Sequence, residues 1–311
     1  MKKVIVTGGA GFIGSHLAEK LAGQNYHVII LDNLLTGKLE NIDELVGKKN
    51  VDFNQGSITD LPLLQKLFQE AEFVFHLAAL TSVPASIEDP LTTNEINVTG
   101  TLNVLIAARD NSVRKVVLAS SCAIYGDAPT SPQKENTPPN PISPYASTKL
   151  AGEYYSHLFR RIYGLTTVCL RYFNVYGPRQ DSQSQYAAVI PAFIGRVVQG
   201  LPPVIFGDGE QSRDFVFIED ITQGTISAAQ SDAEGTCNLG SGKSTSVNQL
   251  AQGILRLTQK SLQPIHAESR PGDSRQSMAD ISRAQSFGYK PEWSLEAGLK
   301  KVIAEFKNKA R

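Results

Sequence analysis

A tyrosine and a lysine four residues apart are the clearest candidates for catalysis in this sequence. They occur in the run Ser143-Pro144-Tyr145-Ala146-Ser147-Thr148-Lys149. Ser143 and Pro144 are typical of a helix start, as N-cap and first helical residue, so Tyr145 and Lys149 would lie one turn apart on the same face. A tyrosine hydroxyl has a pKa of about 10 and needs a cationic neighbour to act as a base near neutral pH. Lys149 and the positive end of the helix could supply that charge, which indicates general acid–base catalysis.

A glycine-rich loop near the N-terminus is the candidate cofactor site. Its glycines, Gly8, Gly11 and Gly14, follow a short β-branched run and precede a helical pattern. Dinucleotide-binding loops have this context, because residues without a Cβ allow a tight turn and a close approach to a pyrophosphate at a helix N-terminus. Asp32 ends the second predicted strand, where a carboxylate can bind an adenosine ribose and repel a 2′-phosphate. The pattern favours NAD over NADP.

The elements that must position these residues alternate along the first half of the chain. Short β-branched runs and helical patterns follow one another, which is typical of βαβ units and a doubly wound parallel sheet. We expect strands at Val4 to Thr7, His27 to Leu31, Phe73 to Leu77, Val116 to Ala119 and Thr166 to Leu170, and helices at Phe12 to Ala22, Leu61 to Gln69, Gly100 to Asp110 and Tyr145 to Ile162. From about Tyr176 the chain is punctuated by Pro and Gly, with Phe215 to Ile218 and the following helix expected to return to the main sheet. The predicted fold is α/β, a Rossmann-type sheet with a smaller C-terminal substrate region.

Composition excludes several classes of partner. Among 311 residues, 30 Lys and Arg balance 30 Asp and Glu, so no overall field attracts nucleic acid or a membrane surface. The three cysteines are widely spaced and fit neither a disulfide framework nor a zinc site. No stretch has the length of a signal h-region or a membrane span. We expect a cytoplasmic protein without a metal.

Further motifs give the sequence a specific resemblance. They are His76-Leu77-Ala78-Ala79, Asn97-Val98-Thr99-Gly100-Thr101, Ser120-Ser121-Cys122-Ala123-Ile124-Tyr125-Gly126, Arg171-Tyr172-Phe173-Asn174-Val175-Tyr176-Gly177, Arg213-Asp214-Phe215 and Arg270-Pro271-Gly272-Asp273. With the glycine loop and the Tyr145/Lys149 pair, the sequence resembles the extended short-chain dehydrogenase/reductase family over almost its whole length. Within that family it is similar to the UDP-sugar 4-epimerases of the UDP-glucose and UDP-N-acetylglucosamine type.

The resemblance implies an activity and a division of the chain. Residues 1–175 would form an NAD-binding domain, to which residues 215–240 return, and residues 176–311 would form a UDP-sugar-binding region. The catalytic residues would be Ser121, Tyr145 and Lys149, with Ser121 relaying the proton of the sugar 4-hydroxyl to Tyr145 and Lys149 holding the nicotinamide ribose; Ser120 remains an alternative sugar contact. NAD would take the C4 hydride and return it to the other face of a 4-keto sugar. A homodimer would form through a four-helix bundle of helices 100–110 and 145–162.

The resemblance also implies two sets of binding residues. Those expected at NAD are Gly8, Gly11, Phe12, Ile13, Gly14, Asp32, Asn33, Gly37, Ser57, Ile58, Leu77, Ala78, Ala79, Asn97, Tyr145, Lys149 and Tyr172. Those expected at the UDP-sugar are Ser82, Ser121, Tyr145, Asn174, Val189, Arg213, Arg270, Asp273 and Ser277. Arginine suits a diphosphate because its planar fork donates two charge-assisted hydrogen bonds. Ser277 matches a gate beside the sugar 2-substituent, and a small residue there leaves space for an acetamido group.

Other activities on the same scaffold fit the sequence less well. Dehydratases need an added acid/base pair where this chain has Cys122-Ala123, and we interpret Cys122 as a packed thiol. A decarboxylase or a UDP-glucuronate 4-epimerase is the nearest alternative, although Asn174 and Asp181 stand where uronate-specific relatives tend to carry Thr and Arg. Ser57 also departs from the usual Asp at an adenine contact. A non-catalytic NAD-binding scaffold is the alternative from another class, but it would not require the Ser121, Tyr145 and Lys149 that are all present.

Overall fold

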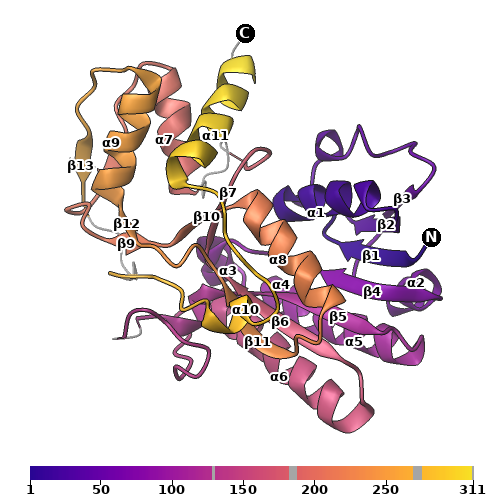
Figure 1. Cartoon of the computed structure of the whole chain (residues 1–311). Coiled ribbons are helices and arrows are strands. Elements are labelled where there is room, and N and C mark those ends of the chain that lie inside the picture. The colour runs from indigo at the N-terminus through magenta and orange to yellow at the C-terminus, as the bar shows by residue number, and fades with distance from the viewer. Residues whose placement is uncertain (128–129, 182–187, 269–274, 310–311) are drawn as a thin grey trace.

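A seven-stranded parallel sheet runs through the centre of the molecule in the computed structural model, which describes residues 1–127, 130–181, 188–268 and 275–309 (Figure 1). The strand order is β11-β6-β5-β4-β1-β2-β3. The strands are β1 (Lys3–Thr7), β2 (His27–Asp32), β3 (Val51–Gln55), β4 (Ala71–His76), β5 (Lys115–Ser121), β6 (Thr167–Tyr172) and β11 (Gly235–Leu239). The predicted doubly wound α/β fold is confirmed. The edge strands β3 and β11 are absent from the predicted set, because their polar residues interrupt the apolar runs.

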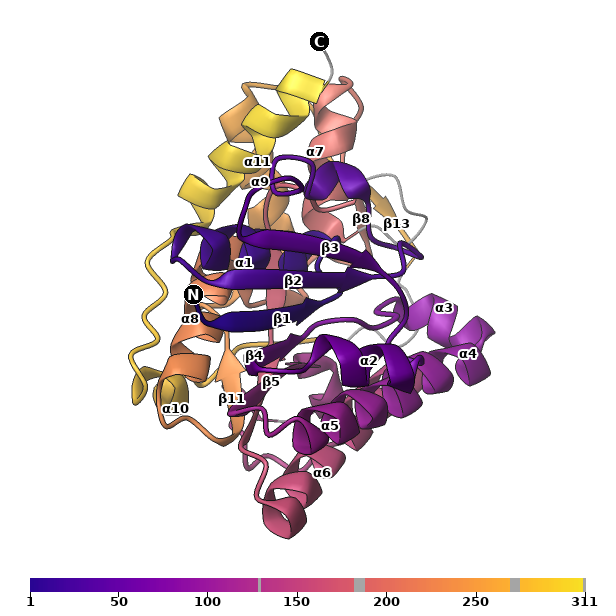
Figure 2. The same cartoon turned by 90° about the vertical axis from the view of Figure 1, so that its right-hand side faces the viewer.

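Helices cover both faces of this sheet, as Figure 2 shows. The helices α1 (Phe12–Gly23) and α8 (Ile218–Gln230) lie on one face, and α2 (Leu61–Leu67), α5 (Gly100–Asp110) and α6 (Pro144–Tyr163) lie on the other. Successive strand residues point to opposite faces. Val4 and Val6 of β1 therefore join a core cluster with Leu17 of α1, whereas Ile5 joins a second cluster with Val104 of α5.

Short elements follow the carboxyl ends of the central strands. A 3-10 turn, Leu39–Asn41, comes after β2, and β4 is followed by α3 (Val83–Glu88), α4 (Pro90–Asn94) and a π-helical turn, Glu95–Thr99, that leads into α5. A second 3-10 turn, Cys122–Tyr125, directly follows β5. These pieces place loop residues at one edge of the sheet, where parallel α/β proteins bind ligands.

The smaller region has its own apolar core, with α7 (Val189–Val198), α9 (Val247–Thr258) and α11 (Leu295–Lys309) packed together. Its strands pair as β7 (Asn174–Tyr176) with β10 (Phe215–Phe217), β9 (Ser212–Arg213) with β12 (Thr245–Ser246), and β8 (Val204–Phe206) with β13 (Ile265–Ala267); α10 (Ser282–Gln285) packs beside β11. The expectation that Phe215 to Ile218 enters the main sheet is wrong for its strand, because β6 continues past Phe173 into β7 and β10 pairs there. The helix α8 and the strand β11 do reach the main sheet.

The start of α6 has the predicted form. The Ser143 hydroxyl accepts a hydrogen bond from the Ala146 N–H at 3.2 Å, with Pro144 as the first helical residue. The helix is capped at its C-terminal end by Gly164, whose φ of +71° is a left-handed conformation that favours glycine. None of the described helices is long and apolar enough to cross a membrane.

Candidate functional site

The glycine loop forms a tight cradle between β1 and α1. Gly8 has a φ of +69°, and a Cβ added to it would lie 2.7 Å from the Ala78 nitrogen. A Cβ on Gly14 would lie 2.1 Å from the Gly8 carbonyl oxygen, so neither position admits a side chain. Gly11 is the N-cap of α1 and has no side chain to occupy the first N–H groups of that helix. The cradle therefore fits the pyrophosphate of a dinucleotide such as NAD.

Asp32 lies beside this cradle and holds it in shape. Its carboxylate accepts hydrogen bonds from Ala10 N–H at 2.9 Å and Leu34 N–H at 2.8 Å. A Cβ on Gly37 would lie 2.7 Å from Asp32 Oδ1, so Gly37 packs directly against the carboxylate. Each carboxylate oxygen has more than one lone-pair site, so Asp32 retains the capacity to accept from a ribose. The ammonium group of Lys38 lies 3.8 Å from the Asp181 carboxylate, so the charge of Lys38 is directed toward Asp181 and not toward Asp32.

The remaining residues expected at NAD take several positions. Ser57 bonds Thr59 at 2.8 Å, Ile58 is buried beneath Gly100, and Asn33 caps the N–H of Leu35. Phe12 and Ile13 begin α1 and pack against the smaller region's core. The hydroxyl of Tyr172 is bonded to Thr225 of α8 at 2.8 Å, in the core beneath the sheet.

Asn97 joins the loop after β4 to the catalytic helix. Its amide oxygen accepts from the Leu80 N–H at 2.8 Å, and its Nδ2 donates to the Leu80 carbonyl at 2.9 Å and to Thr148 Oγ1 at 3.1 Å. The segment Leu77 to Ala79 begins with hydrogen bonds to β1, from Leu77 N–H to the Thr7 carbonyl at 3.1 Å. The side chain of Asn97 is thus occupied in the fold and orients the loop that flanks the cradle.

Tyr145 and Lys149 meet the end of β5 at the same edge of the sheet. The Tyr145 hydroxyl is hydrogen-bonded to Ser121, and Lys149 Nζ donates to the Ala119 carbonyl at 2.9 Å. Lys149 Nζ lies 5.9 Å from the centroid of the Tyr145 ring. The predicted catalytic residues Ser121, Tyr145 and Lys149 are therefore brought together.

The titration behaviour of this pair differs from the expectation. Burial raises the pKa of Tyr145 to about 12, and the hydrogen bond with Ser121 opposes this effect. Burial also lowers the pKa of Lys149 to about 8. Without a further cation, the phenol is a weak acid that holds its proton at neutral pH.

Ser120 and Ser121 point to different surroundings. Ser120 is buried and donates to Glu153 Oε1 at 2.5 Å, while Glu153 forms an ion pair with Arg171, at 2.8 Å between Oε2 and Nη2. Ser121 remains partly exposed and accepts from the Ala123 N–H at 3.1 Å. Only Ser121 is hydrogen-bonded to Tyr145, so the geometry favours Ser121 over Ser120 as the residue that faces a substrate. Glu153 was missed in the sequence, although it follows Tyr145 and Lys149 at the same four-residue spacing.

A cavity of about 520 Å³ opens in the smaller region and contains three of the residues expected at the UDP-sugar. They are Asn174, Val189 and Arg213. The side-chain oxygen of Asn174 is buried without a hydrogen-bond partner, so it is available to a donor on a ligand. Among the other expected residues, Ser82 is the N-cap of α3, and Arg270 and Asp273 lie outside the described residues.

Ser277 contacts both the turn after Ser121 and the strand that carries Arg213. Its hydroxyl is hydrogen-bonded to the thiol of Cys122, which follows Ser121 directly. Its backbone N–H donates to the Ser212 carbonyl at 3.1 Å, next to Arg213. Burial raises the pKa of the Cys122 thiol to about 11, so Cys122 is a packed thiol and not a reactive thiolate.

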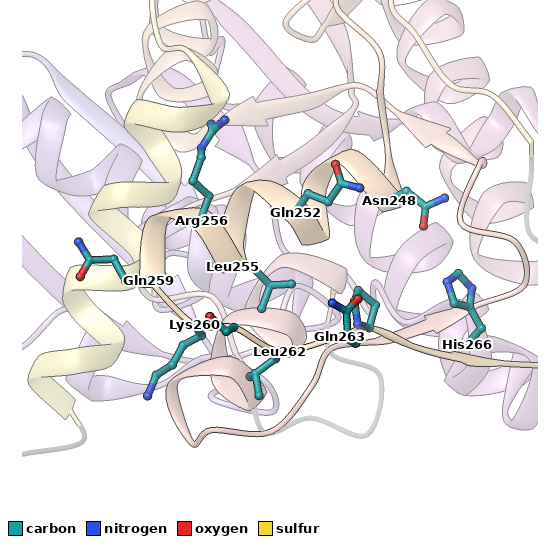
Figure 3. Close-up of a pocket in the computed structure, with 11 residues that line it drawn as sticks. Asn248, Gln252, Leu255, Arg256, Gln259, Lys260, Leu262, Gln263 and His266 are labelled. Carbon is teal, nitrogen blue, oxygen red and sulfur yellow. The ribbon is translucent and has the colours of Figure 1, made fainter.

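A second, more open hollow of about 720 Å³ lies along α9 and the segment after it (Figure 3). Polar side chains such as Gln252, Arg256 and Lys260 line it. Arg256 is paired with Glu296 at 3.1 Å, and none of the residues expected at NAD or the sugar lines the hollow. Among the described residues no cluster of His, Cys, Asp and Glu could hold a metal ion.

Comparisons with known proteins agree with this geometry. Residues 4–240 match the model of the NAD dependent epimerase/dehydratase family. The chain is 42% identical over 310 residues to a protein from Methanocaldococcus jannaschii named putative UDP-glucose 4-epimerase, covering 99% of each. Among solved structures, the UDP-N-acetylglucosamine 4-epimerase from Methanobrevibacter ruminantium, in complex with UDP-N-acetylmuramic acid, is 42% identical with a TM-score of 0.96, covering 99% of both chains. The UDP-glucose 4-epimerase from Thermotoga maritima, with UDP-glucose, is 38% identical with a TM-score of 0.95, covering 99% of this chain and 100% of the other. The chain belongs to the NAD dependent epimerase/dehydratase family, in its extended short-chain dehydrogenase/reductase branch.

Proposed function

We propose that this protein is a UDP-sugar 4-epimerase that works with NAD. The observation that carries the proposal is the hydrogen bond between Ser121 and Tyr145 at the end of β5, with Lys149 close to the tyrosine ring. The glycine cradle at the same edge of the sheet supports a dinucleotide beside them. The three similar proteins described above all carry the name of a UDP-sugar 4-epimerase.

In this mechanism Tyr145 takes the proton of the sugar 4-hydroxyl, and Ser121 relays it. When bound, oxidised NAD supplies the acceptor for the C4 hydride and a positive charge that stabilises the phenolate. Lys149, anchored to Ala119, holds the nicotinamide ribose. The 4-keto sugar then turns in the pocket, and Tyr145 returns the proton when C4 regains its hydrogen on the other face. The sugar regains the hydrogen and the proton that it lost, so the reaction has no net redox change.

For the sugar, we propose UDP-N-acetylglucosamine and UDP-N-acetylgalactosamine as substrates, with UDP-glucose and UDP-galactose also accepted. Ser277 lies beside Cys122, next to the catalytic serine, and we propose that a residue this small, in place of a bulky one, accommodates an acetamido group. A small residue at position 277 also admits the 2-hydroxyl of UDP-glucose and UDP-galactose, which is smaller than an acetamido group. UDP-glucuronate is the less favoured substrate, because Asp181 stands where uronate-specific relatives tend to carry Arg, so this position offers no counter-charge to a uronate.

The proposal extends to the organisation of the protein. Residues 1–175, with residues 215–240 returning, are proposed as the NAD-binding unit, and residues 176–311 as the UDP-sugar-binding unit. A homodimer is proposed through α5 and α6, because Tyr154, Leu158 and Ile162 expose apolar side chains along one stripe of α6. A cytoplasmic location is proposed from the free thiols Cys122, Cys169 and Cys237.

The test is an assay of three epimer pairs: UDP-glucose with UDP-galactose, their N-acetylated forms, and UDP-glucuronate with UDP-galacturonate. Each sugar is incubated with the protein and NAD, and the two epimers are separated by chromatography. We expect interconversion of the N-acetylated and plain pairs. Failure to interconvert any pair would contradict the proposed activity, whereas turnover of the uronate pair alone would contradict only the proposed sugar.

A further inference from the structure

The segment that carries Ser277 lies between the smaller region and the 3-10 turn Cys122–Tyr125, which follows Ser121 and is called the catalytic turn below. Ser277 N–H donates to the Ser212 carbonyl, and two residues later Ala279 N–H donates to Asp214 Oδ2 at 3.1 Å. The Ser277 hydroxyl contacts Cys122 of the turn Cys122–Tyr125. The place of Ser277 therefore depends on what holds the backbone on either side of it.

One buried side chain holds that backbone on both sides. Gln133, with 2% of its surface exposed, donates from Nε2 to the Gln276 carbonyl at 3.3 Å and accepts at Oε1 from the Met278 N–H at 2.8 Å. Gln276 and Met278 are the two neighbours of Ser277 in the chain. The amide group of Gln133 thus spans Ser277, with its donor and its acceptor both used.

The backbone of Gln133 adds a second pair of contacts to the same segment. Gln133 N–H donates to the Met278 carbonyl at 2.8 Å, and Asp280 N–H donates to the Gln133 carbonyl at 2.9 Å. These bonds need no particular side chain at position 133. Substitution of Gln133 would therefore leave the segment attached but free the Gln276 carbonyl and the Met278 N–H from their side-chain partners.

A buried chain of hydrogen bonds continues from Gln133 to the catalytic turn. The Gln133 carbonyl accepts from Asn238 Nδ2 at 3.0 Å, and Asn238 Oδ1 accepts from the Tyr125 hydroxyl at 2.7 Å. Tyr125 is the last residue of the turn that begins directly after Ser121. Ser277 is consequently fixed relative to Ser121 from two directions, by its own hydroxyl through Cys122 and by Gln133 through Asn238 and Tyr125.

We propose that Gln133 is a positioning residue for sugar recognition, which holds Ser277 at a set place beside the catalytic turn. The inference rests on the proposed function and deepens it. Because Gln133 acts through Ser277, it affects how the sugar is bound and leaves the binding of the UDP part unchanged. A side chain misplaced by about 1 Å is enough to weaken a well-fitted site.

The experiment compares wild type with Gln133→Leu and Gln133→Glu. Leu removes both side-chain hydrogen bonds at similar size, whereas Glu keeps the acceptor for Met278 and loses the donor to Gln276. The control is Asn50→Leu, since Asn50 Nδ2 similarly clamps the carbonyls of Ala22 at 3.0 Å and Tyr26 at 2.9 Å, far from the sugar. Calorimetric titration of the NAD-loaded proteins measures the affinities for UDP, UDP-glucose and UDP-N-acetylglucosamine, and thermal melting measures stability.

We expect Gln133→Leu to lower the affinity for the UDP-sugar that wild type prefers by about 10-fold, because two modest hydrogen bonds are lost. The affinity for UDP should stay unchanged. Gln133→Glu should weaken the affinity for this UDP-sugar at least as much as Gln133→Leu, because it buries a carboxylate with one oxygen facing the Gln276 carbonyl oxygen and no donor between them. Asn50→Leu should lower the melting temperature without changing any affinity. Equal changes for UDP and the UDP-sugars, or no change for either in folded Gln133→Leu, would overturn the inference. A wild type that binds UDP-sugars but interconverts none would instead contradict the proposed function, while the Gln133 comparison would still decide the positioning role.

Discussion

At the scale of single residues, the Tyr145 site shows what the protein supplies and what it leaves to the cofactor. Lys149 is bound to the Ala119 carbonyl, and burial dominates the titration of both side chains. Burial favours the neutral form of each group, so the pair by itself keeps a protonated phenol. A cationic nicotinamide beside the Tyr145 ring would favour the phenolate instead. Base catalysis would then occur only in the complex with oxidised NAD, where the hydride can also be accepted.

The first prediction concerns Tyr145→Phe, which removes the ionisable hydroxyl and keeps the ring. We expect kcat for epimerisation to fall by about 100-fold to 10,000-fold, as for the loss of a general base. Binding of NAD should remain nearly intact, because the cradle and Lys149 are unchanged. Steady-state rates and the cofactor content of the purified variant check both parts, and near-normal turnover would refute the role of Tyr145.

A second prediction concerns Asp32, which has a structural role and a proposed binding role. Its carboxylate holds the N–H groups of Ala10 and Leu34, and its proposed role is to accept hydrogen bonds from the adenosine ribose of NAD. Asp32→Asn removes the charge and keeps an acceptor, whereas Asp32→Ala removes both. We expect both variants to bind NAD less tightly and to have a smaller ratio of NAD affinity to NADP affinity. Asp32→Ala should also be less stable. Fluorescence titration with the two cofactors is the measurement, and an unchanged ratio of affinities would leave Asp32 with only its structural task.

A third prediction concerns Ser277→Tyr, which places a large ring against Cys122 in a buried position. Overpacking of this kind costs about 1–3 kcal/mol, or roughly 5- to 150-fold at about 1.4 kcal/mol per decade. An N-acetylated sugar needs more room than a plain one, so the variant should lose UDP-N-acetylglucosamine turnover selectively. Kinetics on both pairs decide the matter, since equal losses would show that Ser277 does not gate the 2-substituent.

Residues with local signals could be predicted from the sequence, and residues with distant partners could not. Ser143, Pro144, Tyr145 and Lys149 lie within seven consecutive residues, and their spacing alone defines a helix start and a face. Gln133 and Met278, in contrast, are 145 positions apart in the chain. No periodicity connects them, so their contact becomes visible only when the smaller region is folded against the loop after β5.

At the scale of elements, the strand ends are tied together beneath the site by a buried histidine. His76, the last residue of β4, bonds Thr7 of β1 through Nδ1 at 2.8 Å and Thr101 of α5 through Nε2 at 2.9 Å. Burial, and secondly the charge of Lys149, lower the pKa of His76 to about 3. The sequence contained His76 in a family motif but gave no indication of this role, because the histidine and its two partners belong to three separate elements.

The fourth prediction follows from this shift. An unfolded histidine takes up a proton below a pH of about 6.5, while folded His76 stays neutral until about pH 3. The unfolded state therefore binds more protons in this window, and His76 lowers the stability of the fold as pH falls from about 6.5 toward 3, with a slope approaching about 1.4 kcal/mol per pH unit.

Urea unfolding of wild type and His76→Gln at pH 7, 6 and 5 measures this effect. Carboxylates titrate in both proteins, so their contribution cancels in the difference between the two. The variant should be less stable at pH 7, because its shorter reach breaks one of the two threonine contacts, and its deficit should shrink at lower pH. A deficit that stays constant from pH 7 to pH 5 would show that His76 is not buried in its neutral form.

At the scale of the whole molecule, the two faces of α6 have different tasks. Tyr145, Lys149 and Glu153 recur every four residues and face the sheet. Nine residues, or about two and a half helical turns, separate Tyr145 from Tyr154, which places Tyr154 on the opposite face. Tyr154, Leu158 and Ile162 recur every four residues in the sequence, but such a period alone does not say whether the apolar side chains meet the chain's own core or another molecule.

Solvent exposure distinguishes these cases. Tyr154, Leu158 and Ile162 are 56%, 46% and 63% exposed, and Leu91 of the neighbouring α4 is 83% exposed. Exposed apolar side chains gathered on neighbouring helices are a common mark of an interface between proteins, which favours the proposed dimer. A two-fold axis beside α6 would pair this stripe with its copy, since two-fold interfaces use the same surface on both subunits.

The fifth prediction is that Leu158→Glu separates the proposed dimer. A charge placed in the middle of the stripe would be buried without a partner in the dimer and solvated in the monomer, so association should weaken by at least about 100-fold. The matched control is Leu201→Glu, because Leu201 is 45% exposed and belongs to the smaller region. Sedimentation velocity should give about twice the 33.7 kDa chain mass for wild type and Leu201→Glu, and the single chain mass for Leu158→Glu. Asn174, Val189 and Arg213 line a cavity formed by a single chain, so UDP should still bind the monomeric variant. A monomeric wild type, or a Leu158→Glu variant that stays dimeric at low micromolar concentration, would show that α6 is not the interface.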